Sequence, residues 1–218
     1  MTNRRRLLIP SLLLVMAGSL LAGLWVSQQP TGRTAWGSAP PEVQAVMWPE
    51  PRHLADFSLQ TQHGQAFDRS SLKGNWSFIF FGYMACPDVC PMSLHALRGM
   101  HDLLASRRAD DNLQYIFVSL DPEHDTPEEM KRYLGWYHEA FIGLHGSLGE
   151  IDRMASTMAI KYAEHIDETG YRSIDHTSSV MIVDPRGRVV GALPPPLEPQ
   201  RMAEQFKNLR SHLRGHRI

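Results

Sequence analysis

Two short and almost unbroken apolar runs constrain the fold more than any other feature of the sequence. They cover residues 76–83 (WSFIFFGY) and 113–120 (LQYIFVSL). Runs of this length are typical of strands buried on both faces, as in parallel sheets covered by helices. Between them, Pro91 suits the first position of a helix. Residues at helical spacing then form one face of that helix: Leu94, Leu97, His101 and Leu104.

Two hairpins are predicted on either side of this strand–helix–strand unit. Residues 57–59 and 66–67 flank a turn at 62–64. Residues 180–183 and 189–193 flank Asp184-Pro185-Arg186-Gly187 in the same way.

Three further helices are predicted. The first begins within residues 125–129, where a cap, a proline and two acids follow one another. The second begins at Ser147, which fits a capping box with Glu150 and precedes an apolar stripe at Ile151, Met154, Ala155 and Met158. The last covers residues 199–213. Together the segments predict an α/β fold with a mixed central sheet.

The composition excludes several classes of protein. The 218 residues suit one domain with additional segments. A formal net charge of −1 gives no electrostatic footprint for nucleic acid. Two cysteines cannot build a disulfide-rich scaffold, nor can they alone hold an iron–sulfur cluster.

The N-terminus predicts a membrane anchor. Arginines at positions 4–6 precede an apolar run over residues 7–26. About 20 apolar residues span a bilayer core of roughly 30 Å, and the positive-inside rule keeps residues 1–6 in the cytoplasm. A cleaved signal peptide is the alternative, but no small-x-small site directly follows the run. We expect an uncleaved single-pass helix in a bacterial inner membrane, with the rest of the chain in the periplasm.

Residues 27–50 are rich in Pro, Gly, Ser and Gln and show no periodic pattern. They predict a flexible linker. The globular domain is therefore expected to cover residues 51–218.

The chemistry of the chain centres on Cys86 and Cys90. Both follow the first buried strand and precede the predicted helix, which is where α/β sheets form their sites. A helix N-terminus favours thiolate. The spacing allows both sulfurs to reach one metal ion or to form a disulfide. A purely stabilising disulfide is the weaker alternative, because closing so short a loop restricts the unfolded chain little.

Two thiolates leave a metal site incomplete, and a histidine is the expected third ligand. There are 11 histidines, and sequence chemistry alone does not choose among them. His95 and His101 follow the cysteines on the helix, whereas His176 stands just before a buried-type strand. Thiolates with imidazole suit copper, Cu(I) in particular. Asp88 and Asp175 lie beside these positions and could tune the site, although loop acids are more often simply solvated.

Four segments resemble the Sco/SenC family of copper-binding assembly factors. They are FFGYMACPDVCP (80–91), SLDPEHDTPEEMKRY (119–133), FIGLHG (141–146) and DHTSSVMIVDPRG (175–187). The resemblance covers about residues 51–213. It implies a thioredoxin-like fold, a mixed sheet flanked by helices, with an N-terminal hairpin and an inserted hairpin.

The resemblance also implies a function. Cys86, Cys90 and His176 would bind one copper ion, as Cu(I) or Cu(II). The protein would help mature the dinuclear copper centre of cytochrome c oxidase, by delivering copper or by reducing the cysteines of the copper-bearing subunit. Some members act instead in redox signalling or copper homeostasis. Met84-Ala85 and His124 depart from the usual family residues without touching the implied ligands.

Because a periplasm is oxidising, the thiols would need a periplasmic thiol reductase as a partner before copper loading. Another copper chaperone is a further candidate partner. The chief alternative function is a thiol–disulfide oxidoreductase, with Cys86 and Cys90 as the redox-active pair. That class normally uses CxxC rather than CxxxC, and a cis-proline rather than a histidine before the later strand. A copper or redox sensor stays open. A peroxiredoxin is disfavoured, because Tyr83 stands where such enzymes place a threonine.

Overall fold

The two apolar runs form the centre of the sheet. In the computed structural model, which describes residues 35–105 and 112–215, strands β4 (Trp76–Gly82) and β5 (Leu113–Ser119) pair in parallel along their whole length. Every residue of β4 is buried. Strand β6 (Phe141–His145) continues the sheet in parallel beyond β5. The prediction of two buried parallel strands is confirmed.

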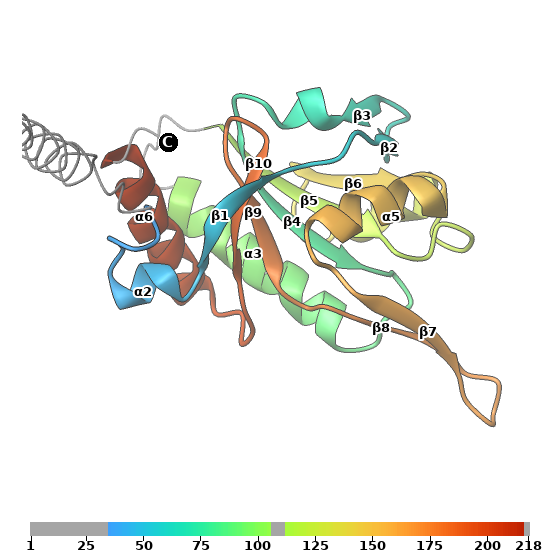
Figure 1. The fold of residues 1–218 in the computed structure, drawn as a ribbon. Helices are drawn as coiled ribbons and strands as arrows, with labels where there is room; N and C mark the ends of the chain where they lie inside the picture. Colours follow the sequence, from blue (N-terminus) through green and yellow to red (C-terminus); the bar gives the residue numbers. More distant parts are fainter. Residues whose placement is uncertain (1–34, 106–111, 216–218) are drawn as a thin grey trace, which may run out of the picture.

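Antiparallel strands extend the sheet on both sides, as Figure 1 shows. The eight strands lie in the order β1-β10-β9-β4-β5-β6-β2-β3. Both predicted hairpins are present, β2 with β3 and β9 with β10. The sheet is mixed, as predicted. The remaining strands are β1 (Met47–His53), β2 (Ser58–Thr61), β3 (Ala66–Asp68), β9 (Val180–Val183) and β10 (Arg188–Leu193).

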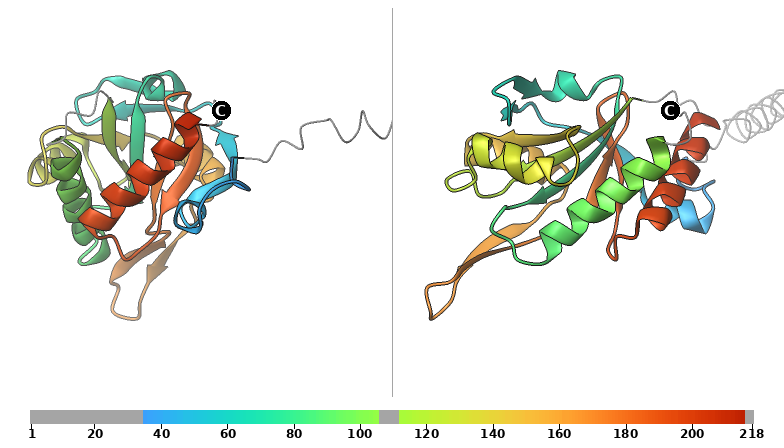
Figure 2. Two further views of the ribbon diagram at one scale, coloured as in Figure 1. Left: turned by 90° about the vertical axis from the view of Figure 1, so that its left-hand side faces the viewer. Right: turned by 180° about the vertical axis from the view of Figure 1, so that it is seen from behind.

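Helices cover both faces of the sheet. The helices are α2 (Pro41–Gln44), α3 (Val89–Ala105), α4 (Pro127–Gly135), α5 (Leu148–Thr157) and α6 (Pro199–Gly215), with a 3₁₀ turn, η1, at Arg69–Leu72. Helices α3 and α6 lie side by side in Figures 1 and 2. Phe206 of α6 packs edge-on against Phe78 of β4, with ring centroids 4.8 Å apart. Tyr133 of α4 meets Phe117 of β5, whereas α5 contacts β2.

The predicted linker boundary is wrong at its C-terminal end. Residues 41–44 form α2, and β1 begins at Met47, inside the stretch assigned to a flexible linker. Strand β1 pairs antiparallel with β10, and Val43, Val46 and Met47 are buried. The prolines in this segment argued against a strand, because Pro lacks the N–H of a ladder hydrogen bond and is expected only at sheet edges. β1 is such an edge strand. The other domain divisions stay predictions.

The predicted helix starts differ in how they are capped. Thr126 caps α4, since its hydroxyl accepts a hydrogen bond from the Glu129 N–H at 3.3 Å. Ser147 begins α5 but makes no capping hydrogen bond through its side chain, so the capping box is wrong. Glu150 instead accepts a hydrogen bond from the backbone N–H of Ser58 at 2.9 Å and pairs with Arg153. A tertiary contact has replaced the local one.

A separate two-stranded ribbon projects from the domain, as Figures 1 and 2 show. It consists of β7 (Tyr162–Ile166) and β8 (Arg172–His176), which pair antiparallel. This ribbon corresponds to the inserted hairpin that the family resemblance implies. Among the described residues, no helix is long and apolar enough to cross a membrane. The predicted anchor at 7–26 lies outside the described residues.

Candidate metal centre

The two cysteines lie where helix α3 follows strand β4. Cys86 is half-buried in the intervening loop, and Cys90 is fully buried in the first turn of α3. The helix begins at Val89, two residues before the predicted start at Pro91. Proline fits within a first turn because its missing N–H would have no helical partner there. The Cys90 N–H donates to the sulfur of Cys86 at 3.4 Å, so Cys86 itself caps the turn.

His176 is the histidine that the fold brings to the thiols. It is the last residue of β8, and its Nε2 lies 3.4 Å from the sulfur of Cys90, although 86 residues separate them. Its Nδ1 lies 3.1 Å from the carbonyl oxygen of Thr177. A carbonyl only accepts, so Nδ1 carries the proton and Nε2 presents its lone pair to the sulfur. This tautomer is the one that binds a metal through Nε2.

Burial sets the protonation of both groups. It lowers the pKa of His176, although the hydrogen bond to Thr177 and the charge of Asp175 act in the opposite direction. It also raises the pKa of the Cys90 thiol. The rings of Phe80 and Tyr83 pack edge-on against the imidazole, with centroids 5.8 and 6.4 Å away. In the metal-free protein the pair is therefore a neutral thiol beside a neutral imidazole, and a metal would displace the thiol proton.

Gly82, the last residue of β4, makes room for the buried sulfur. A Cβ atom at this position would lie 2.8 Å from Cys90 Sγ and 3.1 Å from the rings of Phe80 and Phe117. The contact with the sulfur is closer than real Cβ atoms show, and the contacts with the two rings are tighter than most. The absence of a side chain thus allows the helix to bring Cys90 against the end of the strand.

A surface pocket of about 350 Å³ opens over these groups. Its lining includes Cys86, Asp88, Asp175 and His176. Asp88 is exposed at the rim. Asp175 has a largely exposed side chain and pairs with His165 across the hairpin at 3.2 Å. Both acids are thus near the predicted ligands, and a role in tuning the site stays a prediction.

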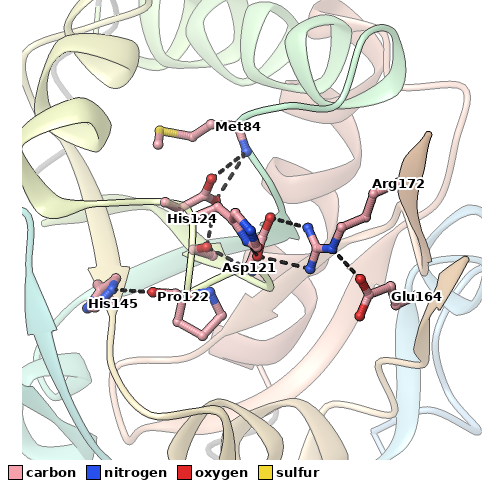
Figure 3. Close-up of polar contacts among 9 residues, drawn as sticks. Met84, Asp121, Pro122, His124, His145, Glu164 and Arg172 are labelled. Atoms are coloured by element: carbon pink, nitrogen blue, oxygen red, sulfur yellow. Dashed lines mark hydrogen bonds and ion pairs between the residues drawn. The ribbon is translucent and has the colours of Figure 1, made fainter. Parts of the chain in front are cut away.

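Two buried acids that the sequence left without a role hold the two halves of the site. Both lie in the loop after β5, and Figure 3 labels one of them, Asp121. Asp125 accepts hydrogen bonds from the backbone N–H of Met84 at 3.2 Å and from the hydroxyl of Ser119 at 2.6 Å. It thereby fixes the start of the cysteine loop. Burial raises the pKa of Asp125.

Asp121 holds the other half, the hairpin that ends in His176. Arg172 donates to it through Nη2 at 3.1 Å and also pairs with Glu164 of β7 (Figure 3). The Nδ1 of His124 lies 2.7 Å from the same carboxylate. No pattern in the sequence marks these acids as buried. Their partners lie on other elements, and loop acids are usually solvated.

The donor set fits a soft metal ion. Two sulfurs and one imidazole are ligands of Cu(I), whereas a structural zinc site takes four protein ligands. Copper would be held by Cys86, Cys90 and His176, and the adjoining pocket leaves one side open to exchange. The fold and this site together define a class: a thioredoxin-like domain in which a CxxxC motif lies beside a histidine.

Comparison with known proteins places the chain more narrowly. The SCO1/SenC family model matches residues 47–211. The chain belongs to this family. An SCO2-like protein of Rickettsia conorii is 33% identical over 156 residues, which make up 70% of this chain and 75% of the relative.

Solved structures agree with the family assignment. ScoI of Bradyrhizobium japonicum, solved with copper bound, is 34% identical with a TM-score of 0.63, covering 72% of this chain and 99% of that one. ScoI of Arabidopsis thaliana, also with copper bound, is 26% identical with a TM-score of 0.67, covering 72% and 98%. The predicted thioredoxin-like fold is confirmed.

Proposed function

We propose that this protein binds one copper ion through Cys86, Cys90 and His176 and hands it on to cytochrome c oxidase. The observation that carries the proposal is the 3.4 Å approach of His176 Nε2 to Cys90 Sγ, with Nδ1 tied to the Thr177 carbonyl. This arrangement presents a lone pair and a thiol to the same point. The copper-bound relatives and the family membership support copper as the ion.

The proposed acceptor is the copper-bearing subunit of cytochrome c oxidase, whose dinuclear centre needs copper. A three-ligand site beside an open pocket suits transfer, because an incoming thiolate can bind the ion before Cys86 or His176 releases it. As copper leaves, Cys90 regains a proton. Burial favours that protonated thiol, since it raises the Cys90 pKa, and so assists release.

The site is proposed to act in the periplasm, held to the inner membrane by residues 7–26. The apolar run after three arginines supports this location. In that compartment the same two sulfurs could be oxidised to a disulfide, which cannot coordinate as thiolate. A periplasmic thiol reductase is therefore proposed to attack the disulfide, pass through a mixed disulfide and leave both cysteines reduced.

The unequal exposure of the two thiols favours a second candidate function, thiol–disulfide exchange. Cys86 is half-buried and adjoins the pocket, whereas Cys90 is fully buried. Cys86 could attack a disulfide of the target, and Cys90 would then resolve the mixed disulfide. Two electrons would pass to the target, which gains two thiols while Cys86 and Cys90 become a disulfide.

Anaerobic Cu(I) titration of the reduced full-length protein, in competition with a chromophoric chelator, tests the copper site. We expect one equivalent to bind, and His176→Ala to weaken binding by about 100-fold, or about 2.7 kcal/mol. His165→Ala is the matched control, because His165 lies on the same hairpin with an exposed side chain. Equal affinity in wild type and His176→Ala would overturn the ligand set.

Two further mixtures separate delivery from reduction. Copper-loaded protein is mixed with the reduced copper-binding domain of the oxidase, and copper-free reduced protein is mixed with the oxidised domain. Copper transfer in the first mixture supports the chaperone. Reduction of the target disulfide in the second mixture, without copper transfer in the first, supports the oxidoreductase and argues against delivery.

A further inference from the structure

A second group of metal-binding side chains lies away from the cysteines. His101 and Asp102 near the end of α3 meet His138, which follows α4, and one ligand atom from each lies within 4.8 Å of the others. His101 Nδ1 and Asp102 Oδ1 are 3.2 Å apart. The two imidazole rings are 4.0 Å apart between centroids, at an angle of 44°.

Contacts between α3 and the segment that follows α4 build this group. Tyr137, two residues after the end of α4, packs edge-on against His95 of α3 with centroids 5.0 Å apart. His138 then follows, its N–H donating to the carbonyl of Leu134 at 3.0 Å. This hydrogen bond holds His138 in the short segment after α4, where its imidazole ring lies 4.0 Å from that of His101 on α3.

The cluster of His101, Asp102 and His138 is partly exposed to solvent and packs against buried aromatic rings. His101 has 21% of its side chain exposed and Asp102 has 60%. Beneath them, the ring of Tyr115 packs edge-on against His101 at 5.2 Å and is stacked on Phe141. The Tyr115 hydroxyl is buried without a hydrogen-bond partner among the described residues, and the Asp102 charge acts on it. A polar group therefore lies unsatisfied beside the cluster.

We propose that His101, Asp102 and His138 form a second metal site, for a divalent ion of the Zn²⁺ or Cu²⁺ type. Two imidazoles and a carboxylate are borderline and hard donors, unlike the soft sulfurs of the first site. Zinc binds such groups at about 2.0–2.2 Å, so neighbouring ligand atoms lie about 3.3 Å apart. The observed spacing needs only small side-chain rotations to reach this.

Binding requires one local change. Nδ1 of His138 accepts a hydrogen bond from the Ala140 N–H at 3.1 Å, which places the ring proton on Nε2. Coordination through Nε2 therefore breaks that hydrogen bond and moves the proton to Nδ1. His101 lies 11 positions beyond Cys90 on α3, about 16 Å along the helix. The two sites could thus hold different ions at the same time.

Zn²⁺ titration of the full-length protein by calorimetry tests the proposal, with Cys86→Ser/Cys90→Ser removing the thiol ligands. We expect one equivalent to bind to this variant and His138→Gln, added to it, to weaken binding at least tenfold. His63→Ala is the matched control, since His63 is exposed in the turn after β2. It should leave Zn²⁺ binding unchanged. Oxidised wild type, with its sulfurs in a disulfide, replaces the serine variant should that variant misfold.

Thermal melting provides an independent readout. A ligand that binds only the folded state raises the melting temperature. Zn²⁺ should raise it in the serine variant and in the His63→Ala form, but not in the His138→Gln form. With Cu²⁺, electron paramagnetic resonance should show nitrogen coupling that His138→Gln reduces. No saturable binding to the serine variant, or equal binding with and without His138, overturns the proposal.

Discussion

Asp121 and Arg172 form an ion pair that ties the hairpin bearing His176 to the central sheet. Arg172 Nη2 lies 3.1 Å from Asp121 Oδ1, and only 2% of the Asp121 side chain is exposed. Asp121 follows β5, and Arg172 begins β8, four positions before His176. The pair therefore sets the place of a predicted ligand without contacting the metal.

Replacing Arg172 with methionine keeps much of its apolar stem but leaves Asp121 with His124 as its remaining side-chain partner among the described residues. A buried carboxylate that loses its cation is strongly destabilising, and we expect a loss of about 2–4 kcal/mol in the free energy of unfolding. Urea denaturation measures it. Arg201→Met, at an exposed position of α6, is the control and should change stability by less than about 0.5 kcal/mol. Equal effects of the two substitutions would contradict the role of the pair.

The same pair predicts how stability depends on pH. Burial acts to raise the pKa of Asp121, but hydrogen bonds from Arg172 and His124 outweigh it and hold the pKa below its ordinary value. The folded-state pKa is thus below the unfolded one, about 3.9. The stabilisation is present above about pH 4 and is lost as the pH falls through the folded-state pKa.

Denaturation of wild type and Asp121→Asn between about pH 6 and pH 3 measures this. The difference in free energy of unfolding between wild type and Asp121→Asn should stay constant near about pH 6. It should become smaller below about pH 4. In an Arg172→Met background the narrowing should be smaller, because the group that lowers the pKa is gone. If the difference in free energy of unfolding is the same at about pH 6 and about pH 3, the prediction is refuted.

Gly82 predicts a steric test of the buried sulfur. Alanine would place a Cβ atom 2.8 Å from Cys90 Sγ, so Gly82→Ala should cost about 1–3 kcal/mol of stability and weaken Cu(I) binding. Gly149→Ala is the control, because a Cβ there meets no atom within 4 Å. That substitution lies in α5 and should stabilise the protein slightly. If both variants bind Cu(I) like wild type, Gly82 does not govern the site.

The two thiols should differ in reactivity. Cys86 is half-buried, whereas Cys90 is fully buried and its pKa is raised by burial. Since the thiolate is the reactive form, iodoacetamide at pH 8 should modify Cys86 at least about tenfold faster. Mass spectrometry of proteolytic peptides from the reduced protein, taken over time, measures both rates. Comparable rates would show that Cys90 is not shielded in solution.

Local sequence patterns predicted much of the fold. The runs at 76–83 and 113–120 predicted β4 and β5 because a strand buried on both faces must be apolar throughout. The helical spacing after the cysteines predicted the buried face of α3, with Leu94, Leu97 and Leu104 all buried. The cysteines stood out for the same local reason, since they directly follow a strand.

Features that depend on distant partners were not predictable. β1 is a strand because it pairs with β10 at the far end of the chain. Asp121 is buried because Arg172, 51 residues away, neutralises it. Residue chemistry alone left the third ligand open among the histidines, and only the family resemblance selected His176. The approach of its Nε2 to Cys90 comes from the fold of the hairpin.

The described part of the fold begins close to the proposed membrane anchor. Residues from Ala35 onward belong to the fold, and the Ala35 carbonyl accepts a hydrogen bond from His212 at 2.6 Å. If residues 7–26 span the membrane as proposed, residues 27–34 are all that separates the anchor from the first described residue, Ala35. About 8 residues reach at most about 28 Å, against about 80 Å for the 24 or so first assigned. The domain would therefore stay close to the bilayer surface. Any acceptor of its copper would have to present its site at the same short distance from the membrane.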